Sequence, residues 1–241
     1  MLNFIRRIRK GLKDSASARK YLLYAVGEIA LVVIGILLAL QVNNWNEWRK
    51  DRVREQEIIE NVYGNITLNI ELLRSNLAFL DHLNRSTTII EEVIINQKPY
   101  ADSLNFHFSN ARKHGFLNFM LSKSGYEAYK NAGFDLVLNK QLKDKIIDLF
   151  EAILPRLERA YDFVESESEL TRILVFDSFY MINNDSLLPK DYKELLSDKK
   201  YLSLFRRIEE NRLLLQERIE DSIKQSEKVL HLIKYELVKA R

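Results

Sequence analysis

One acidic residue lies inside the most apolar stretch of the chain. Residues 21–42 read YLLYAVGEIALVVIGILLALQV, and Glu28 is the single charged residue among them. An ionisable side chain is costly in a membrane helix, so it marks a functional candidate there. Three roles stay open for Glu28: a hydrogen bond to another helix of an oligomer, a position near headgroups beside Arg19 and Lys20, or part of an ion or proton path.

Small residues lie on nearly the same helical face as this acid. Gly27 and Glu28 precede Gly35 by eight and seven positions. Ala39 follows Gly35 by four positions and completes a small-xxx-small pair. Small side chains let two helices approach closely in a bilayer. Gly27, Gly35 and Ala39 therefore predict a helix-packing surface.

Amide side chains follow the apolar run. Gln41, Asn43 and Asn44 precede Trp45, whose ring is typical of the aromatic belt at a membrane surface. In an oligomer, we expect these four residues to form an interface or the mouth of a pore.

The remaining reactive residues form no recognisable catalytic constellation. Histidines occur only at His82, His107, His114 and His231, without an H-E-x-x-H pattern or a recurring Glu-x-x-His pair. His107 and His114 would share a face only if their segment were one helix. Ser197 and Lys200 match S-x-x-K without its companion motifs, and no glycine-rich phosphate loop occurs. The sequence therefore predicts no enzyme, no metal and no cofactor.

The length of the apolar run predicts a membrane span. About 20 residues of helix cover the roughly 30 Å hydrocarbon core of a bilayer. A cleaved signal peptide would have a shorter apolar core and a small-residue cleavage site, which residues 39–45 lack. We expect an uncleaved membrane anchor.

Basic residues concentrate before the run. Seven Lys and Arg residues precede it and four occur in the 20 residues after it, so the N-terminus is expected in the cytoplasm and the C-terminal domain in the periplasm. The tail carries a net charge of +6 in a chain of +3, which favours membrane lipids over nucleic acid as its partner. The residues expected at the headgroups are Arg6, Arg7, Arg9, Lys10, Lys13, Arg19 and Lys20.

The composition favours long helices. Only 7 glycines and 3 prolines occur in 241 residues, and the absence of cysteine excludes disulfides and thiolate metal sites. We expect an all-α protein whose N-terminal transmembrane helix continues toward an extramembrane bundle of long helices. The expected parts are a basic amphipathic cytoplasmic segment (1–20), the span (21–42), a long helix leaving the membrane (43–98) and a helical bundle domain (99–241).

Apolar residues recur at helical spacing in three segments outside the run. The stripes are Ile59, Val62, Ile66, Ile70, Leu73, Leu77 and Leu80; then Leu142, Ile146, Leu149, Ile153, Leu157, Tyr161 and Val164; then Leu204, Ile208, Leu215, Ile219, Ile223, Leu230, Ile233 and Leu237. They predict an antiparallel bundle, or a coiled coil that oligomerises. We also expect a helix over 116–132 closed by Gly133, a helix over 140–181 kinked at Pro155, a polar connection at 182–186 and a helix opened by Pro189. The aromatic patch of Tyr126, Tyr129 and Phe134 is expected in the core, with a ligand groove as the alternative.

Two stretches resemble a known family. Gly27-Glu28-Ile29 followed by LVVIGILLALQVNNWNEW, within residues 4–50, is similar to uncharacterised single-span membrane proteins of Bacteroidota that share a domain of unknown function. Ser124-Gly125-Tyr126-Glu127, Asn131-Ala132-Gly133 and residues 142–146 add to the resemblance. It implies an integral membrane protein with a helical extramembrane part, and no catalytic residues.

These observations predict a non-enzymatic function. We expect a membrane-anchored, homo-oligomeric helical scaffold or sensor that binds a protein partner or a small ligand outside the cytoplasm. The alternative is a homo-oligomeric channel or ion-coupled membrane assembly that uses Glu28.

Overall fold

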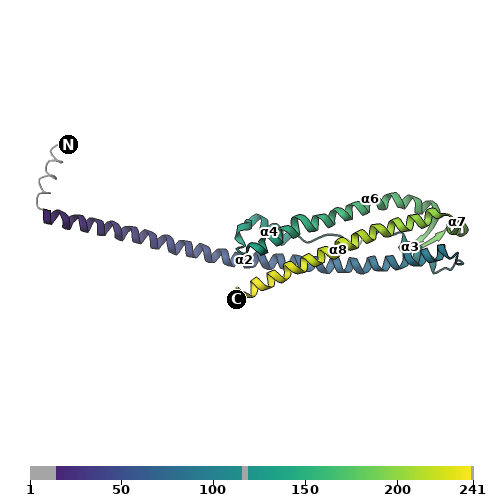
Figure 1. Cartoon of the computed structure of the whole chain (residues 1–241), viewed down its shortest axis with the longest axis horizontal. Coiled ribbons are helices and arrows are strands. Elements are labelled where there is room, and N and C mark those ends of the chain that lie inside the picture. The colour runs from purple at the N-terminus through teal and green to yellow at the C-terminus, as the bar shows by residue number, and fades with distance from the viewer. Residues whose placement is uncertain (1–14, 116–118, 240–241) are drawn as a thin grey trace, which may run out of the picture. The chain divides into compact units, whose positions relative to one another are not determined.

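The computed structural model describes residues 15–115 and 119–239, and these residues form an all-α protein, as predicted (Figure 1). Its elements are the helices α2 (Ser15–Ile95), α3 (Leu104–Ala111), α4 (Ser124–Ala132), η1 (Phe134–Leu136), α5 (Lys140–Asp148), η2 (Leu149–Ile153), α6 (Leu154–Ser178), α7 (Tyr192–Ser197) and α8 (Lys199–Lys239), with the strands β1 (Phe179–Asn183) and β2 (Ser186–Pro189).

The chain divides into two compact units, Met1–Arg54 and Glu55–Arg241, and α2 contributes to both. In the first unit, the described part of α2 is long and apolar enough to cross a membrane, and none of its apolar window is buried. A helix with apolar side chains on every side suits lipid rather than water. In the second unit, which we call the bundle, α2 supplies one wall of the core.

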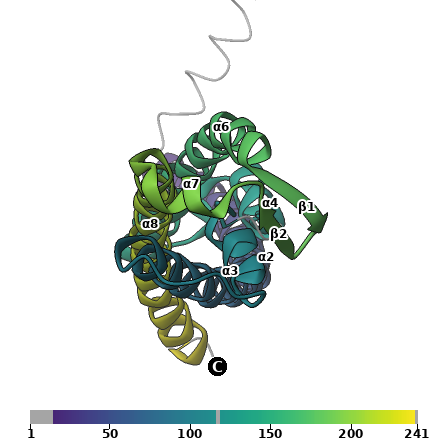
Figure 2. The ribbon, with the colours of Figure 1, turned by 90° about the vertical axis from the view of Figure 1, so that its right-hand side faces the viewer.

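The bundle is built on the three predicted apolar stripes. Ile59, Val62 and Ile66 of α2, for example, are each at most 2% exposed, because the stripe faces the other helices. α8 runs antiparallel to α2: Arg74 bonds Glu227 at 2.7 Å, while Arg206 bonds Glu91 at 3.0 Å. Viewed along the bundle, α2, α6 and α8 surround the core (Figure 2).

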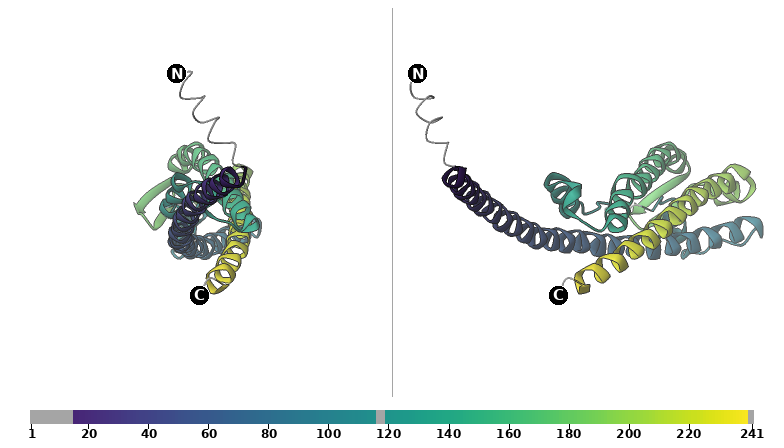
Figure 3. Two further views of the ribbon diagram at one scale, coloured as in Figure 1. Left: turned by 90° about the vertical axis from the view of Figure 1, so that its left-hand side faces the viewer. Right: turned by 60° about the vertical axis from the view of Figure 1, so that its left-hand side comes forward.

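Two apolar clusters fill this core. The first joins α2, from Ile58 to Leu80, to α4, α5, the start of α6 and the C-terminal part of α8. The second joins the end of α2 to α3, the end of α6, the hairpin, α7 and the start of α8. Figure 3 shows that the C-terminal part of α8 lies at the same end of the bundle as α4.

Three local predictions are corrected. The helix expected over 116–132 begins at Ser124, where the returning chain turns against α2. The helix expected to reach residue 181 ends at Ser178, and residues 179–189 form an antiparallel hairpin instead of a polar connection and a helix start. Phe179 and Leu187 are buried in the second cluster, so tertiary packing favours extended backbone here. Pro189 therefore ends β2, and α7 begins later, at Tyr192.

Two other local signals have a clear structural counterpart. Gly133 is the C-cap of α4 with φ 95° and ψ 130°, a backbone conformation that suits glycine, and its N–H bonds the Lys130 carbonyl. A π turn over Leu149–Ile153 ends two residues before Pro155, which lacks the N–H needed for a regular helical hydrogen bond.

The start of α5 gives a first testable prediction. Asn139 caps it by accepting the Leu142 N–H at 3.1 Å, and its amide donates to Glu236 of α8 at 2.7 Å. We expect Asn139→Ala to lower the free energy of unfolding by about 1 to 2 kcal/mol. Urea unfolding of the full chain in mild detergent measures it. Asn139→Ser should recover the part of the loss that comes from the cap, because it keeps the capping oxygen, whereas equal losses in both variants would contradict the capping role.

Candidate functional site

The residues that the sequence singled out in the apolar run all lie on the exposed surface of α2. Glu28, Gly27, Gly35 and Ala39 are exposed, and a Cβ atom added to either glycine would meet no other atom within 4 Å. No other described residue covers this face. The helix-packing surface and the role of Glu28 stay predictions.

The flanking candidates are placed in the same way. Gln41, Asn43 and Asn44 are exposed, and Trp45 is 62% exposed. Arg19 and Lys20 are exposed as well. Five of the expected headgroup residues, Arg6, Arg7, Arg9, Lys10 and Lys13, lie outside the described residues.

The aromatic patch belongs to the core, as expected. Tyr126 and Tyr129 are 2% and 0% exposed, and Tyr126 stacks on Phe150 with ring centroids 4.5 Å apart. The Tyr126 hydroxyl donates to Glu151 at 2.8 Å, and burial raises the pKa of this tyrosine. The groove alternative is therefore not needed to explain these rings.

A layer of buried polar side chains separates the two apolar clusters. On α8, the apolar residues Ile208 and Leu215 belong to different clusters, and polar residues stand between them. On α2 and α6, polar residues likewise separate the apolar residues of the first cluster from those of the second. We call the buried members of this set the polar layer: Ser86, Thr87, Asn110, His114, Thr171, Asn211 and Arg212.

Arg212 is the largest side chain in the polar layer and is 0% exposed. Its guanidinium donates to the Asn84 side-chain oxygen at 3.1 Å and to the backbone carbonyl of Ala111. Burial lowers its pKa to about 10, so it stays charged at neutral pH. No ion pair joins Arg212 to a carboxylate among the described residues. A buried cation held only by neutral acceptors is unusual, because desolvation of a charge is costly.

His114 lies beside this arginine. It is 5% exposed, and its Nε2 lies 2.6 Å from the Thr171 hydroxyl oxygen, which links the segment after α3 to α6. Burial and the positive charge of Arg212 lower the pKa of His114 to about 4, so the ring is neutral at pH 7. Its Nδ1 is buried and has no hydrogen-bond partner among the described residues.

A cavity of about 220 Å³ opens at this level of the bundle. It is lined by Phe79, Arg112, Lys113, His114, Gly115, Ser168, Thr171, Arg172 and Val175. Cations, hydroxyls and two apolar side chains therefore line one partly open cavity. We take this cavity as the candidate functional site.

Two acidic residues near the cavity each bond a cation. Asp185 bonds Lys113 at 3.0 Å, and Glu167 bonds Arg207 at 3.1 Å. Burial lowers the pKa of Arg112, and Asp185 only partly offsets this effect. Asp185 therefore balances part of the positive charge of Arg112 and Lys113.

A separate polar contact fixes the chain that leads to α4. The Asn69 amide donates to the Ser122 carbonyl at 2.9 Å and accepts from the Ser122 N–H at 2.7 Å. Asn65 accepts from the Gly125 N–H at 2.6 Å. These bonds give the Ser124-Gly125 motif a structural explanation, because they dock the returning chain onto α2.

The histidines do not assemble a metal site. α3 ends at Ala111, so His107 and His114 do not share one helix. Nδ1 of His107 lies 3.2 Å from Ser86 Oγ. Within residues 15–115 and 119–239, no group of three or more His, Asp or Glu side chains is placed to hold a metal ion.

Comparison with protein families, with curated proteins and with solved structures gave no match for this chain. The family resemblance of residues 4–50 therefore stays a prediction. The candidate site has to be judged from its own geometry.

Sequence reasoning missed this site, although one signal pointed to it. Arg212 occupies a position of the apolar stripe, four residues after Ile208 and three before Leu215. A charged residue at such a position is expected only where the core is polar or binds something.

Proposed function

We propose that this chain is a membrane-anchored binding protein of the sensor or scaffold type. In this proposal the apolar part of α2 lies in a bacterial inner membrane, the N-terminus is cytoplasmic and the bundle is periplasmic. The observation that carries it is the cavity of about 220 Å³ in the polar layer of the bundle. A scaffold without a ligand would be more stable with an apolar core at that level.

Membrane extraction tests the anchoring part. We expect the full chain to stay in the membrane pellet after alkaline carbonate washing, at its uncleaved mass. Protease added to intact spheroplasts should digest the bundle, because the positive-inside rule places it outside the cytoplasm. Release into the supernatant, or a mass that indicates cleavage after the apolar run, would refute the anchor.

The mass of the full chain in mild detergent tests oligomerisation through the apolar helix. We expect a defined oligomer that dissociates in Glu28→Leu and in Gly35→Leu, because both changes alter the same helical face. Val33→Leu, on another face, is the matched control and should leave the mass unchanged. A monomer unaffected by all three changes would reduce the helix to an anchor. Bilayer conductance that disappears in Glu28→Gln would instead favour the channel alternative.

A further inference from the structure

The cavity in the polar layer combines cations from two parts of the bundle. Arg112 and Lys113 follow α3, whereas Arg172 belongs to α6, and all three line the cavity. Arg212 adds a fourth charge close to His114. Of the nearby carboxylates, Asp185 bonds Lys113 at 3.0 Å, whereas Glu167 bonds Arg207, which does not line the cavity.

Two buried nitrogen atoms at the cavity lack hydrogen bonds. Nε of Arg112 and Nδ1 of His114 are buried and have no partner among the described residues. Buried polar groups are nearly always hydrogen-bonded in folded proteins. Nε of Arg112 is a donor. The Thr171 hydroxyl donates its proton to the Ser168 carbonyl at 3.1 Å, so Nε2 of His114 donates to Thr171 and Nδ1 is an acceptor. An acceptor group in the cavity would satisfy Nε of Arg112.

We infer that this cavity binds a small organic anion, with a carboxylate or phosphate group held by Arg112 and Arg172. The inference rests on the proposed function, since it names the ligand class of the binding protein. Arginine suits both oxyanions because its planar guanidinium donates two parallel hydrogen bonds.

The size and lining of the cavity limit the rest of the ligand. A cavity of about 220 Å³ is large enough for a small organic molecule, since an apolar cavity of about 150 Å³ holds benzene. Phe79 and Val175 provide apolar wall, and Ser168 and Thr171 provide hydroxyls. The ligand therefore has a short carbon body next to its charged group.

Binding of defined probes to the purified full chain in mild detergent tests the inference. The probes are propionate, benzoate and inorganic phosphate, with propionamide and benzamide as neutral analogues and sodium chloride at matched ionic strength. We expect at least one anion to bind with a Kd of about 1 mM or tighter by calorimetry and to raise the melting temperature, while the amides do neither. The carboxylate and phosphate arms identify which oxyanion the site prefers.

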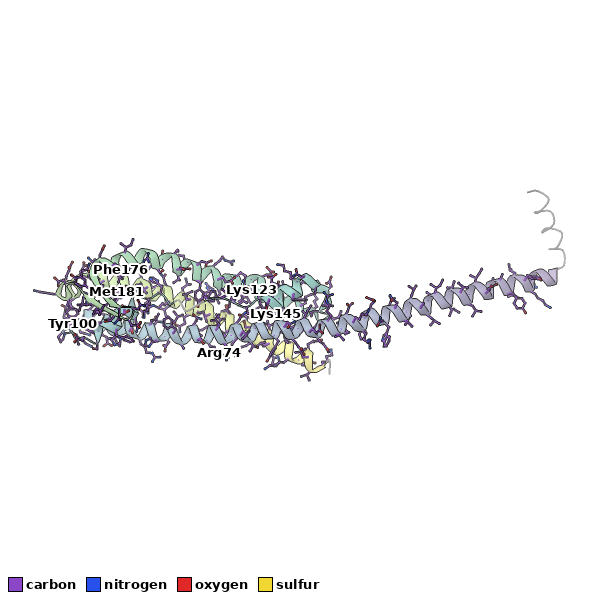
Figure 4. All side chains as sticks on the ribbon, turned by 180° about the vertical axis from the view of Figure 1, so that it is seen from behind. Arg74, Tyr100, Lys123, Lys145, Phe176 and Met181 are labelled. Atoms are coloured by element: carbon purple, nitrogen blue, oxygen red, sulfur yellow. The ribbon has the colours of Figure 1, made fainter. Side chains whose placement is uncertain are left out.

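Charge-removing variants locate the site. Arg112→Gln and Arg172→Gln should each weaken anion binding at least about tenfold, because each removes one charged hydrogen-bonding group. Arg74→Gln is the matched control: Arg74 lies on the outside of α2, labelled in Figure 4, and bonds Glu227 rather than the cavity. The Arg74→Gln protein should bind the anion as tightly as the wild type does. Arg172 is exposed, so its variant remains informative even where Arg112→Gln lowers the melting temperature of the free protein.

Three outcomes would overturn the inference: equal binding of anions and amides, unchanged affinity in both cavity variants, or no binding of any probe to the folded protein. These outcomes are separate from those for anchoring. A chain that resists carbonate extraction yet binds no anion refutes only the ligand class. A chain that is extracted yet binds the anion refutes only the anchor.

Discussion

Replacing Gly125 with alanine is expected to lower the free energy of unfolding of the bundle by about 3 kcal/mol. An added Cβ would lie 2.6 Å from the backbone carbon and oxygen of Asn61 and 2.9 Å from the side-chain oxygen of Asn65. A backbone neighbour cannot rotate away, so α4 has to move off α2. That movement also lengthens the bond from the Gly125 N–H to Asn65, whose oxygen is buried.

Gly64→Ala is the matched control for this experiment. Gly64 lies on the same helix as Asn61, and a Cβ added there would meet no atom within 4 Å. The same chemical change should therefore stabilise the protein by about 0.5 to 1 kcal/mol, because alanine favours a helix more than glycine does. Urea unfolding of both variants, followed by circular dichroism in mild detergent, measures the two effects. Equal effects, or a stable Gly125→Ala protein, would contradict the close approach of α4 to α2.

The two glycines also show how far the sequence could be interpreted. Periodicity identified the long helices correctly, because a buried stripe repeats every three or four residues on a single element. It could not distinguish Gly64, which is exposed, from Gly125, which is pressed against α2. That difference depends on a contact between residues about sixty positions apart, and no local pattern records it.

The candidate site was out of reach for the same reason. His114, Thr171 and Arg212 come from three separate segments, and only the fold brings them to one level of the bundle. The hairpin was missed because its strands are stabilised by burial of Phe179 and Leu187 in a core formed by distant helices. Exposed candidates such as Glu28 were found readily, because a charge in an apolar run is visible in the sequence itself.

Acidification should weaken the bundle through His114. In the folded chain the pKa of His114 is lowered from its ordinary value of 6.5 to about 4, mainly by burial and then by the charge of Arg212. Glu167 opposes this shift, and Arg112, Lys113 and Arg172 line the same cavity. Between these two pKa values the unfolded chain binds more protons than the folded one. Stability is therefore fully present above about pH 6.5 and is lost as the pH falls toward about 4.

Between about pH 7 and about pH 5, His114 is expected to lower the free energy of unfolding by about 2 kcal/mol. Urea unfolding of the wild type and of His114→Gln at both pH values measures it, since glutamine keeps a polar group opposite Thr171 and does not titrate. The drop in stability should be about 2 kcal/mol smaller in His114→Gln than in the wild type. His231→Gln, at an exposed position of α8, should behave as the wild type does. An equal drop in His114→Gln would mean that His114 takes up a proton in the folded bundle as readily as in the unfolded chain. Because an anion in the cavity would favour that protonated form, the same pair of proteins measured with bound benzoate should show a smaller loss on acidification.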